Sequence, residues 1–108
     1  MIKPKKRIAV VILNYNGINH LKKFLPSVVK YSDKKISELY VIDNNSNDES
    51  VNFIRKNYPS VNIIQNKKNY GYAKGYNIGL SQIDLKYLVL LNNDVEAVSY
   101  THLRAHET

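Results

Sequence analysis

The sequence predicts an α/β fold in which helices flank a mostly parallel sheet. Three short apolar runs, at residues 8–13, 39–42 and 87–91, each lead directly into asparagine or aspartate. Apolar runs of this length that are rich in Val, Ile and Leu suit strands buried on both faces of a parallel sheet. Stretches with helical spacing separate the runs, and such alternation is typical of right-handed βαβ units. Because ligands bind at the carboxyl edge of these sheets, the three polar clusters should converge on one site.

The first expected strand, residues 8–13, is followed by an amphipathic helix. From Ile18 onward, apolar residues recur at the spacings of three and four that one buried helix face requires: Leu21, Phe24, Leu25 and Val28. Pro26 lies inside this pattern. We expect it to break or kink the helix, and it could begin a second short helical piece, because proline lacks the donor N–H and clashes with the preceding turn.

The second expected strand, residues 39–42, leads into a helix that ends before Pro59. Ser46 and Glu49 stand three positions apart, in the form of a capping box that would start this helix. The remaining expected elements are a strand at residues 61–65, a helix at residues 71–83 and a strand at residues 87–91.

Length and composition favour one globular domain, or part of one, in the cytoplasm. The chain has 108 residues, of which 44% are hydrophobic and 23% charged, which suffices for a core and argues against disorder. The absence of cysteine excludes disulfides, thiolate metal sites and cysteine nucleophiles. The longest apolar run, residues 8–13, is far shorter than the roughly 20 residues of a membrane span, and no signal-peptide cleavage site follows it.

The chain is basic, with a formal net charge of +7 and a basic N-terminal extension at residues 1–7. This extension is either an ordinary solvated terminus or a region attracted to anionic lipid or to a phosphate-bearing ligand. Peripheral membrane contact is therefore one partner hypothesis. Nucleic acid is disfavoured as a partner, because the nine tyrosines are scattered and no compact basic stripe interleaves with them.

The final segment, residues 97–108, differs sharply in composition from the rest of the chain. It holds two of the three histidines and both threonines, but none of the 14 asparagines or 13 lysines. The segment also resembles an artefactual tail on a truncated reading frame. We expect it to be foreign to the fold, and the alternative is an ordinary polar C-terminus.

Asn92, Asn93 and Asp94, at the end of the last expected strand, form a candidate metal site. A carboxylate in this position can hold Mg²⁺ or Mn²⁺, which take their remaining ligands from water and substrate phosphates. The cation would neutralise charge that builds on a diphosphate leaving group. The alternative is an ordinary turn or helix cap after a strand.

Asp43 and Asn44 follow the second expected strand and could bind the polar edge of a base or the hydroxyls of a ribose. The next two residues, Asn45 and Ser46, also suit a turn and a helix cap. Asp43 has no capping role in this interpretation, so a role in binding is favoured for it.

The cluster Asn14, Tyr15 and Asn16 follows the first expected strand. The ring of Tyr15 could stack on a flat base or lie against its edge. The following Gly17 permits a tight turn, which an ordinary βα connection would explain equally well.

Glycine recurs at positions 71, 75 and 79 of the third expected helix, although glycine in a helix interior costs about 1 kcal/mol relative to alanine. One bare helix face results, which either a ligand or the sheet could approach closely. Asn69 could cap this helix, whose N-terminus favours an anion such as phosphate. Lys74 could add a charge-assisted contact.

Two common nucleotide-binding motifs are missing. No Gly-x-Gly-x-x-Gly follows the first expected strand, and no Gly-x-x-x-x-Gly-Lys-Ser/Thr occurs in the chain. The sequence therefore lacks the main evidence for an NAD-type dehydrogenase or for a P-loop enzyme. A receiver-type or flavodoxin-like domain is disfavoured as well, because Asp43 and Asp94 alone make a poor acidic phosphate-site pocket.

Four ordered motifs resemble family 2 glycosyltransferases, in particular the rhamnosyltransferase-like branch that builds cell-surface polysaccharides. They are Ile-Leu-Asn-Tyr-Asn-Gly, Val-Ile-Asp-Asn-Asn-Ser-Asn-Asp, Asn-Tyr-Gly-Tyr-Ala-Lys-Gly-Tyr-Asn-Ile-Gly and Leu-Leu-Asn-Asn-Asp-Val. The resemblance covers residues 7–96. It implies a GT-A fold, with a Rossmann-like three-layer α/β/α arrangement, that binds a nucleotide-diphosphate sugar together with Mg²⁺ or Mn²⁺.

The resemblance also implies roles for the site residues. Tyr15 would contact the base together with Asp43 or Asn44, since many members carry two adjacent acidic residues at this place. Asp94 would be the metal ligand, and Asn92 takes the first place of the family's Asp-x-Asp motif. The remaining residues of the expected donor site are Asn14, Asn16, Lys74, Asn77 and Asn93.

We therefore predict a nucleotide-sugar-binding part of a GT-A domain at residues 8–96, between the basic extension and the atypical tail. The family's acceptor-binding half and catalytic carboxylate lie beyond these motifs, so no catalytic base is assigned. The parent enzyme would transfer a sugar with inversion to a glycan or lipid-linked acceptor, at the inner membrane face. This chain, truncated soon after Asp94, would be inactive alone. The alternative is a small non-catalytic nucleotide-binding or interaction module.

Overall fold

A computed structural model describes residues 7–92 and 106–107 of the chain. Strands and helices alternate along it, as the sequence predicts, and the two residues of the last strand were not predicted. The elements are β1 Ile8–Asn14, α1 Ile18–Tyr31, β2 Ser37–Asp43, α2 Ser50–Asn57, β3 Asn62–Gln65, α3 Tyr72–Leu80, β4 Tyr87–Asn92 and β5 His106–Glu107. Among the described residues, no helix has both the length and the apolar composition needed to cross a membrane.

The sheet has the strand order β3-β2-β1-β4-β5, with β1 at its centre. Strand β1 pairs in parallel with both β2 and β4, and β3 pairs in parallel with β2. Only β5 is antiparallel among the described strands, pairing with the start of β4. The mostly parallel sheet expected from the three apolar runs is therefore confirmed.

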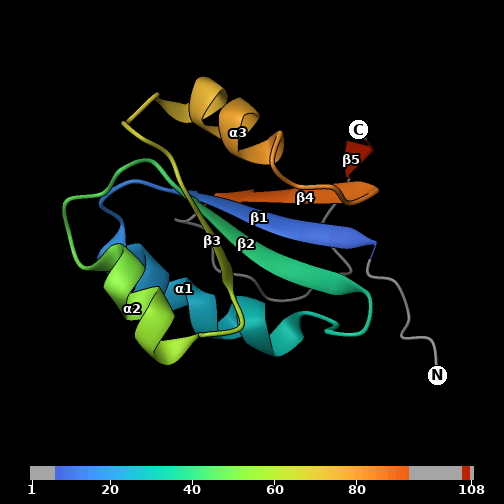
Figure 1. Cartoon of the computed structure of the whole chain (residues 1–108). Coiled ribbons are helices and arrows are strands. Elements are labelled where there is room, and N and C mark those ends of the chain that lie inside the picture. Colours follow the sequence, from blue (N-terminus) through green and yellow to red (C-terminus); the bar gives the residue numbers. More distant parts are fainter. Residues whose placement is uncertain (1–6, 93–105, 108) are drawn as a thin grey trace.

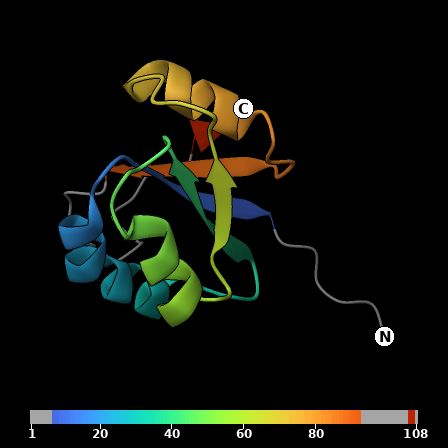
Figure 2. The same ribbon diagram turned by 60° about the vertical axis from the view of Figure 1, so that its left-hand side comes forward.

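Helices cover both faces of the sheet, which gives the three-layer α/β/α arrangement that the resemblance implied. Helices α1 and α2 lie on one face and α3 lies on the other (Figures 1 and 2). Successive side chains of a strand point to opposite faces, so Val10 and Ile12 of β1 join the core under α1 and α2, whereas Ala9 and Val11 join the core under α3. Burial on both faces explains why the central strand β1 is apolar at every position from Ile8 to Leu13.

The predicted break at Pro26 is wrong, because α1 runs from Ile18 to Tyr31 with Pro26 inside it. Proline in a helix interior costs about 3 kcal/mol, since one backbone hydrogen bond is lost and the ring crowds the preceding turn. The buried side chains of α1 lie on both sides of the proline and pack on the sheet: Leu21, Phe24, Leu25 and Val28. This packing holds the two halves in one helix, while Pro26 itself lies on the exposed face.

The predicted capping box is also wrong. Helix α2 begins at Ser50 after the N-cap residue Glu49, and no side-chain hydrogen bond from this residue caps the helix. The hydroxyl of Ser46 instead donates to the carboxylate of Asp43 at 2.7 Å, a charged acceptor that competes well with backbone groups. The carboxylate of Asp48 accepts the backbone N–H of Ser50 at 3.0 Å.

Candidate functional site

The ends of the parallel strands meet at one edge of the sheet. Asn14 of β1 is paired in register with Asp43 of β2, and Leu13 is paired with Asn92 of β4. In Figure 1 the connections that follow β1, β2 and β3 lie close together at this carboxyl edge. The predicted convergence of clusters that are far apart in the sequence is thus present for the described residues, whereas Asn93 and Asp94 lie outside the described residues.

The carboxylate of Asp43 joins the loops after β1 and β2. It is 1% exposed and accepts hydrogen bonds from the Asn14 amide at 3.0 Å, the Ser46 hydroxyl at 2.7 Å and the Ser46 backbone N–H at 2.9 Å. The Ser46 oxygen in turn accepts the backbone N–H of Asn16 at 2.9 Å. Asp43 therefore has a positioning role in the loops that carry the candidate site.

A second contact between the same loops runs through Asn16 and Asp48. Asn16 has a left-handed φ of 49°, and its side-chain oxygen accepts the backbone N–H of Asn47 at 2.7 Å. The carboxylate of Asp48 accepts the first N–H of α1, from Ile18, at 3.1 Å. Asp48 thus links the start of α1 to the start of α2, and no sequence pattern predicted this role.

Burial raises the pKa of the Asp48 carboxyl, and hydrogen bonds lower it. The hydrogen bonds together have the larger effect. The donors are the Ser50 hydroxyl and the backbone N–H groups of Ser50 and Ile18, and the pKa lies below its ordinary value as a result. A carboxylate that accepts several hydrogen bonds is stabilised in its charged form. Asp48 therefore presents a fixed negative charge at the start of both helices.

Asn44 and Asn66 fasten helix α3 to the sheet. The Asn44 amide donates to the carbonyl of Gly71 at 2.9 Å, and the Asn66 amide donates to the Asn44 side-chain oxygen at 2.8 Å and to the carbonyl of Gly75 at 3.2 Å. Both side chains are at most 5% exposed. The Asn66 side-chain oxygen is buried without a hydrogen-bond partner in the described part of the chain. Sequence reasoning missed Asn66.

The glycine face of α3 packs on the sheet. A Cβ at Gly75 would lie 2.5 Å from the amide nitrogen of Asn44, and a Cβ at Gly79 would overlap the side chain of Ile42. Of the two interpretations of this face, close helix-on-sheet packing is therefore the one found for these two glycines. Gly71 differs, with a φ of 82° and open space where a Cβ would be.

Tyr76 bridges the two central strands near their carboxyl ends. Its hydroxyl oxygen accepts the backbone N–H of Leu13 at 3.2 Å and donates to the carbonyl of Leu91 at 2.9 Å. Burial raises the pKa of Tyr76 well above its ordinary value, so the hydroxyl keeps its proton and remains a donor. This contact lies one residue before Asn14 and Asn92, and the sequence did not predict it.

The other predicted site residues differ in their access to solvent. Tyr15 is 43% exposed, and Asn16, Lys74 and Asn77 are exposed as well. Asn14 is fully buried at the end of β1. The exposed side chains are therefore the ones that a ligand can reach directly, and the buried ones hold the loops in place.

The predicted metal ligand Asp94 lies outside the described residues. Its neighbour Asn92 is the last residue of β4, which places the backbone of that strand at the carboxyl edge. Within residues 7–92 and 106–107, no group of three or more His, Cys, Asp or Glu residues could hold a metal ion. The metal site consequently stays a prediction.

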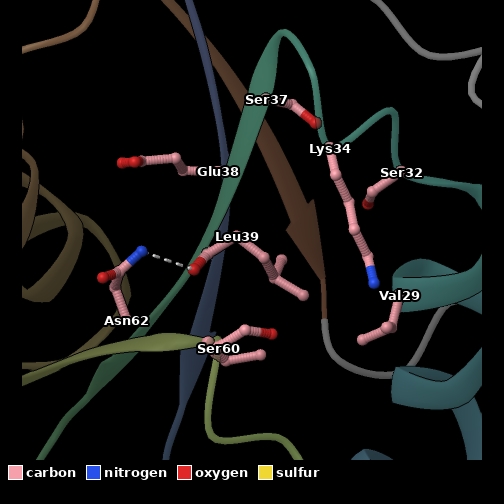
Figure 3. A pocket seen from close by; sticks show the side chains of 9 residues that line it. Val29, Ser32, Lys34, Ser37, Glu38, Leu39, Ser60 and Asn62 are labelled. Carbon is pink, nitrogen blue, oxygen red and sulfur yellow. Dashed lines mark hydrogen bonds between the residues drawn. The ribbon is translucent and has the colours of Figure 1, made fainter. Parts of the chain in front are cut away.

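A hollow of about 180 Å³ lies at the opposite edge of the sheet (Figure 3), and none of the predicted site residues that the structure describes lines it. Val29 of α1 and Leu39 of β2 contribute apolar walls, and Lys34 extends along the hollow. Glu38, the carboxylate among the side chains drawn, points to the other side of β2 from the Lys34 ammonium group. The hollow has none of the polar side chains that converge at the carboxyl edge.

Comparison with known proteins gives one family. The model of glycosyl transferase family 2 matches residues 9–101. The poly(ribitol-phosphate) β-N-acetylglucosaminyltransferase TarP of Staphylococcus aureus (strain N315) is 33% identical over 93 residues, which are 82% of this chain. The matched part spans 28% of the length of TarP.

Solved structures share the fold. The TarS 1-349 structure of S. aureus superposes with a TM-score of 0.76 at 22% identity, over 88% of this chain and 29% of TarS 1-349, and it has also been solved with UDP-GlcNAc. The mannosyltransferase PcManGT of Pyrobaculum calidifontis, in complex with GDP-Man and Mn²⁺, gives 0.75 at 20% identity, over 88% of this chain and 29% of that protein. The predicted GT-A fold is thereby confirmed, while the rhamnosyltransferase-like branch stays a prediction.

Proposed function

We propose that this chain, which belongs to glycosyl transferase family 2, is the part of a glycosyltransferase that binds the nucleotide-sugar donor. The observation that carries the proposal is the register of the parallel strands, which brings Asn14, Asp43 and the end of β4 to one edge. The chain spans 28% of its curated relative. The activity of the whole protein is accordingly part of the proposal.

The donor lies at the carboxyl edge, with its base near Tyr15. Support comes from the exposure of Tyr15 and from the UDP-GlcNAc and GDP-Man complexes of TarS and PcManGT. The carboxylate of Asp43 accepts three hydrogen bonds, so at least one acceptor position remains for a base N–H. Asn44 uses one donor and one acceptor position inside the protein and also retains one of each. In this proposal either residue contacts the base, as the resemblance left open, and the loops that bury the two side chains move to admit it.

Lys74 and Asn77 of α3 lie near the phosphates and the sugar in this proposal. Both are exposed on a helix whose N-terminus is fastened to the sheet edge through Asn44. An ammonium group and free backbone N–H groups at a helix start favour a phosphate. Asn16 and Asn93 complete the set of polar side chains around the donor.

A divalent cation, Mg²⁺ or Mn²⁺, is held by Asp94 beside Asn92 in this proposal. When bound, such a cation neutralises the negative charge of the departing diphosphate. The Mn²⁺ in the PcManGT complex supports a metal in this fold. The chain's own residues bind and orient the donor in this proposal, and no residue of the chain is assigned as the base that takes the proton of the acceptor hydroxyl.

The parent enzyme is an inverting transferase that adds a sugar to a glycan or lipid-linked acceptor during the synthesis of a surface polysaccharide. The name of TarP, which describes transfer to poly(ribitol-phosphate), supports a surface polymer as the acceptor class. A cytoplasmic location at the inner membrane face agrees with the basic residues 1–7 of the sequence. On its own, the chain binds donor and does not transfer sugar.

Calorimetry with UDP, dTDP and GDP, each with and without Mn²⁺, tests the proposal. We expect one of these nucleotides to bind only with Mn²⁺, and Asp94→Asn to abolish this Mn²⁺-dependent binding. Asp84→Asn, an exposed aspartate before β4, is the matched control and should leave binding unchanged. Metal-independent binding, or no binding by a folded chain, would instead support a small non-catalytic module.

A further inference from the structure

The connection between α1 and β2 exposes apolar and basic side chains together. Tyr31 and Ile36 are 47% and 41% exposed, and they are two of the four large hydrophobic side chains that are exposed in the described part of the chain. Lys34 and Lys35 lie between them in the sequence and are exposed as well. Exposed apolar side chains that are gathered in one place mark a contact surface more often than scattered ones do.

Two further basic residues border this connection. Lys30 lies in the last turn of α1, and its ammonium group is 5.4 Å from the centre of the Tyr31 ring. Arg7 comes directly before β1, and its backbone N–H donates to the carbonyl of Ile36 at 2.9 Å. All these side chains belong to the edge of the sheet at which β1 and β2 begin (Figure 1). We call the following residues the amino-edge patch: Arg7, Lys30, Tyr31, Lys34, Lys35 and Ile36.

The amino-edge patch carries an excess of positive charge. It has four basic residues, and Asp33 is the one acidic residue within residues 30–36, so the local net charge is +3. Among the residues that the structure describes, the ammonium groups of Lys34 and Lys35 form no ion pair. The next carboxylate along the chain, that of Glu38, accepts the hydroxyl of Tyr40 at 2.8 Å. The sequence adds three more lysines just before Arg7, at positions 3, 5 and 6.

Hydrogen bonds hold the connection in one shape. The carboxylate of Asp33 accepts the backbone N–H of Lys35 at 2.9 Å. The carbonyl of Asp33 accepts the backbone N–H groups of Ile36 at 3.2 Å and of Ser37 at 2.9 Å. A connection that is fixed in this way loses little conformational freedom when it binds a partner, which favours binding.

We propose that the amino-edge patch binds the surface of an anionic lipid bilayer. The proposal rests on the location proposed above for the parent enzyme and names the surface that meets the membrane. Clusters of four to eight lysines and arginines are typical of segments that bind anionic lipid. Tyrosine suits the headgroup level of a bilayer, and an exposed isoleucine can enter the boundary of the acyl chains. A nucleic acid matches the patch less well, because its phosphate backbone offers Ile36 no apolar partner.

This orientation leaves the proposed donor site open to solvent. Asn14 and Asp43 are the last residues of β1 and β2, and each of these strands is seven residues long. At about 3.3 Å per residue, the amino and carboxyl edges of the sheet are roughly 20 Å apart. A water-soluble nucleotide-sugar can therefore reach the carboxyl edge while the amino edge lies on the membrane.

Sedimentation of the full 108-residue chain with lipid vesicles compares two lysine pairs. Lys34→Gln/Lys35→Gln removes two charges from the amino-edge patch. Lys67→Gln/Lys68→Gln removes the same charge from the exposed residues that follow β3, at the carboxyl edge. The vesicles contain phosphatidylglycerol and phosphatidylcholine in equal parts, or phosphatidylcholine alone. Binding is measured at about 0.15 M salt, where charges interact over only about 8 Å.

We expect the wild-type chain to bind the anionic vesicles and not phosphatidylcholine alone. Lys34→Gln/Lys35→Gln should weaken this binding about 10-fold or more, because each lysine near an anionic surface contributes to it. Lys67→Gln/Lys68→Gln should change it less than about 2-fold, because these charges lie too far from the bilayer at this salt concentration.

A tryptophan introduced into the chain, which has none of its own, reports which edge meets the bilayer. Tyr31→Trp places it in the amino-edge patch. Tyr72→Trp is the matched control, since Tyr72 is 62% exposed at the start of α3, next to the carboxyl edge. We expect vesicles with brominated lipid to quench the emission of Tyr31→Trp and to shift it to shorter wavelength. The emission of Tyr72→Trp should stay unchanged.

Several results would overturn the proposal. They are equal weakening in both lysine variants, equal quenching of both tryptophans, binding to phosphatidylcholine alone, and no binding of a folded wild-type chain to anionic vesicles. Stronger binding to an oligonucleotide than to the vesicles, lost in Lys34→Gln/Lys35→Gln, would replace the membrane by a nucleic acid.

Nucleotide binding with Mn²⁺, titrated in the absence of vesicles, separates this proposal from the donor-binding function. It should be equal in the wild type and in Lys34→Gln/Lys35→Gln, because the two lysines lie at the edge opposite to the donor site. A wild-type chain that binds anionic vesicles through the amino-edge patch but binds no nucleotide would support the membrane contact and contradict the donor-binding function.

Discussion

The hydroxyl group of Tyr76 connects the two strands on which the candidate site depends. It accepts a hydrogen bond from Leu13 of β1 and donates one to Leu91 of β4. Asn14 and Asn92, the next residue on each strand, begin two of the polar clusters. A single buried side chain from α3 therefore adds to the backbone pairing that holds the ends of β1 and β4 together.

Tyr76→Phe removes this hydroxyl and keeps the ring. We expect the free energy of unfolding to fall by about 1–2 kcal/mol, because a buried N–H and a buried carbonyl each lose a partner. Urea unfolding measures the change. Tyr40→Phe is the matched control, since the Tyr40 hydroxyl donates to Glu38 at 2.8 Å in a partly exposed position, and its loss should cost less. Equal losses in the two variants would contradict the role of Tyr76.

Because of Asp48, the stability of the fold should depend on pH in the acidic range. The pKa of its carboxyl lies below the ordinary 3.8 in the folded chain, so the folded state favours the ionised form. The stabilisation from Asp48 is therefore complete above about pH 4 and is lost as the pH falls through the lowered folded pKa. In Asp48→Asn, unfolding should be easier than in the wild type at pH 7, and this difference should shrink toward pH 3. A difference that stays constant over this range would argue against the hydrogen bonds that lower the pKa.

At the level of elements, the sequence predicted every described strand except β5, and each to within two residues. The apolar runs were sufficient because strands of a parallel sheet are buried on both faces. The predicted break at Pro26 was wrong. The free-energy cost of a proline in a helix can be read from the local sequence. The packing of α1 on the sheet, which outweighs that cost, cannot be seen in a short window of sequence. The predicted capping box was wrong for a local reason, since Asp43, only three residues earlier, accepts the hydrogen bond of the Ser46 hydroxyl.

The candidate site was predictable in its position but not in its internal contacts. Polar residues after apolar runs predicted the carboxyl edge correctly, as the pairing of Asn14 with Asp43 shows. The sequence could not tell that Asp43 and Asn44 are buried, because their partners Asn14, Asn66 and Gly71 come from other parts of the chain. The glycine face of α3 could equally have approached a ligand or the sheet, and only the close contacts of Gly75 and Gly79 showed that it packs on the sheet.

Gly79 is the point at which α3 approaches β2 most closely. A Cβ at this position would lie 2.6 Å from both Cγ atoms of Ile42, well inside van der Waals contact. Gly79→Ala should lower the free energy of unfolding by about 1–2 kcal/mol, since overpacking outweighs the roughly 1 kcal/mol that alanine gains in a helix. Combining it with Ile42→Ala should recover part of that loss in a double-mutant cycle. Additive effects of the two substitutions would show that this contact does not limit packing.

At the scale of the whole molecule, the sheet topology brings motifs that are separate in the sequence to one candidate site. Residues 14, 43 and 92 are far apart in the sequence, and the parallel pairing of β1 with β2 and β4 brings them to one edge. The hollow near Lys34 lies at the opposite edge. We infer that a nucleotide-sugar and its cation bind at the carboxyl edge, where residues 14, 43 and 92 meet.

The most direct test is nuclear magnetic resonance of the isotope-labelled chain with nucleotide and paramagnetic Mn²⁺, which broadens the amide signals near the cation. If the cation binds at the carboxyl edge, we expect the amide signals of residues 14–17, 43–46 and 71–74 to broaden when UDP, dTDP or GDP is present. The amide signals of Lys34 and Ser60 should not broaden. Asp94→Asn should abolish the effect. Broadening centred on Lys34 and Ser60, or broadening that persists in Asp94→Asn, would contradict the account.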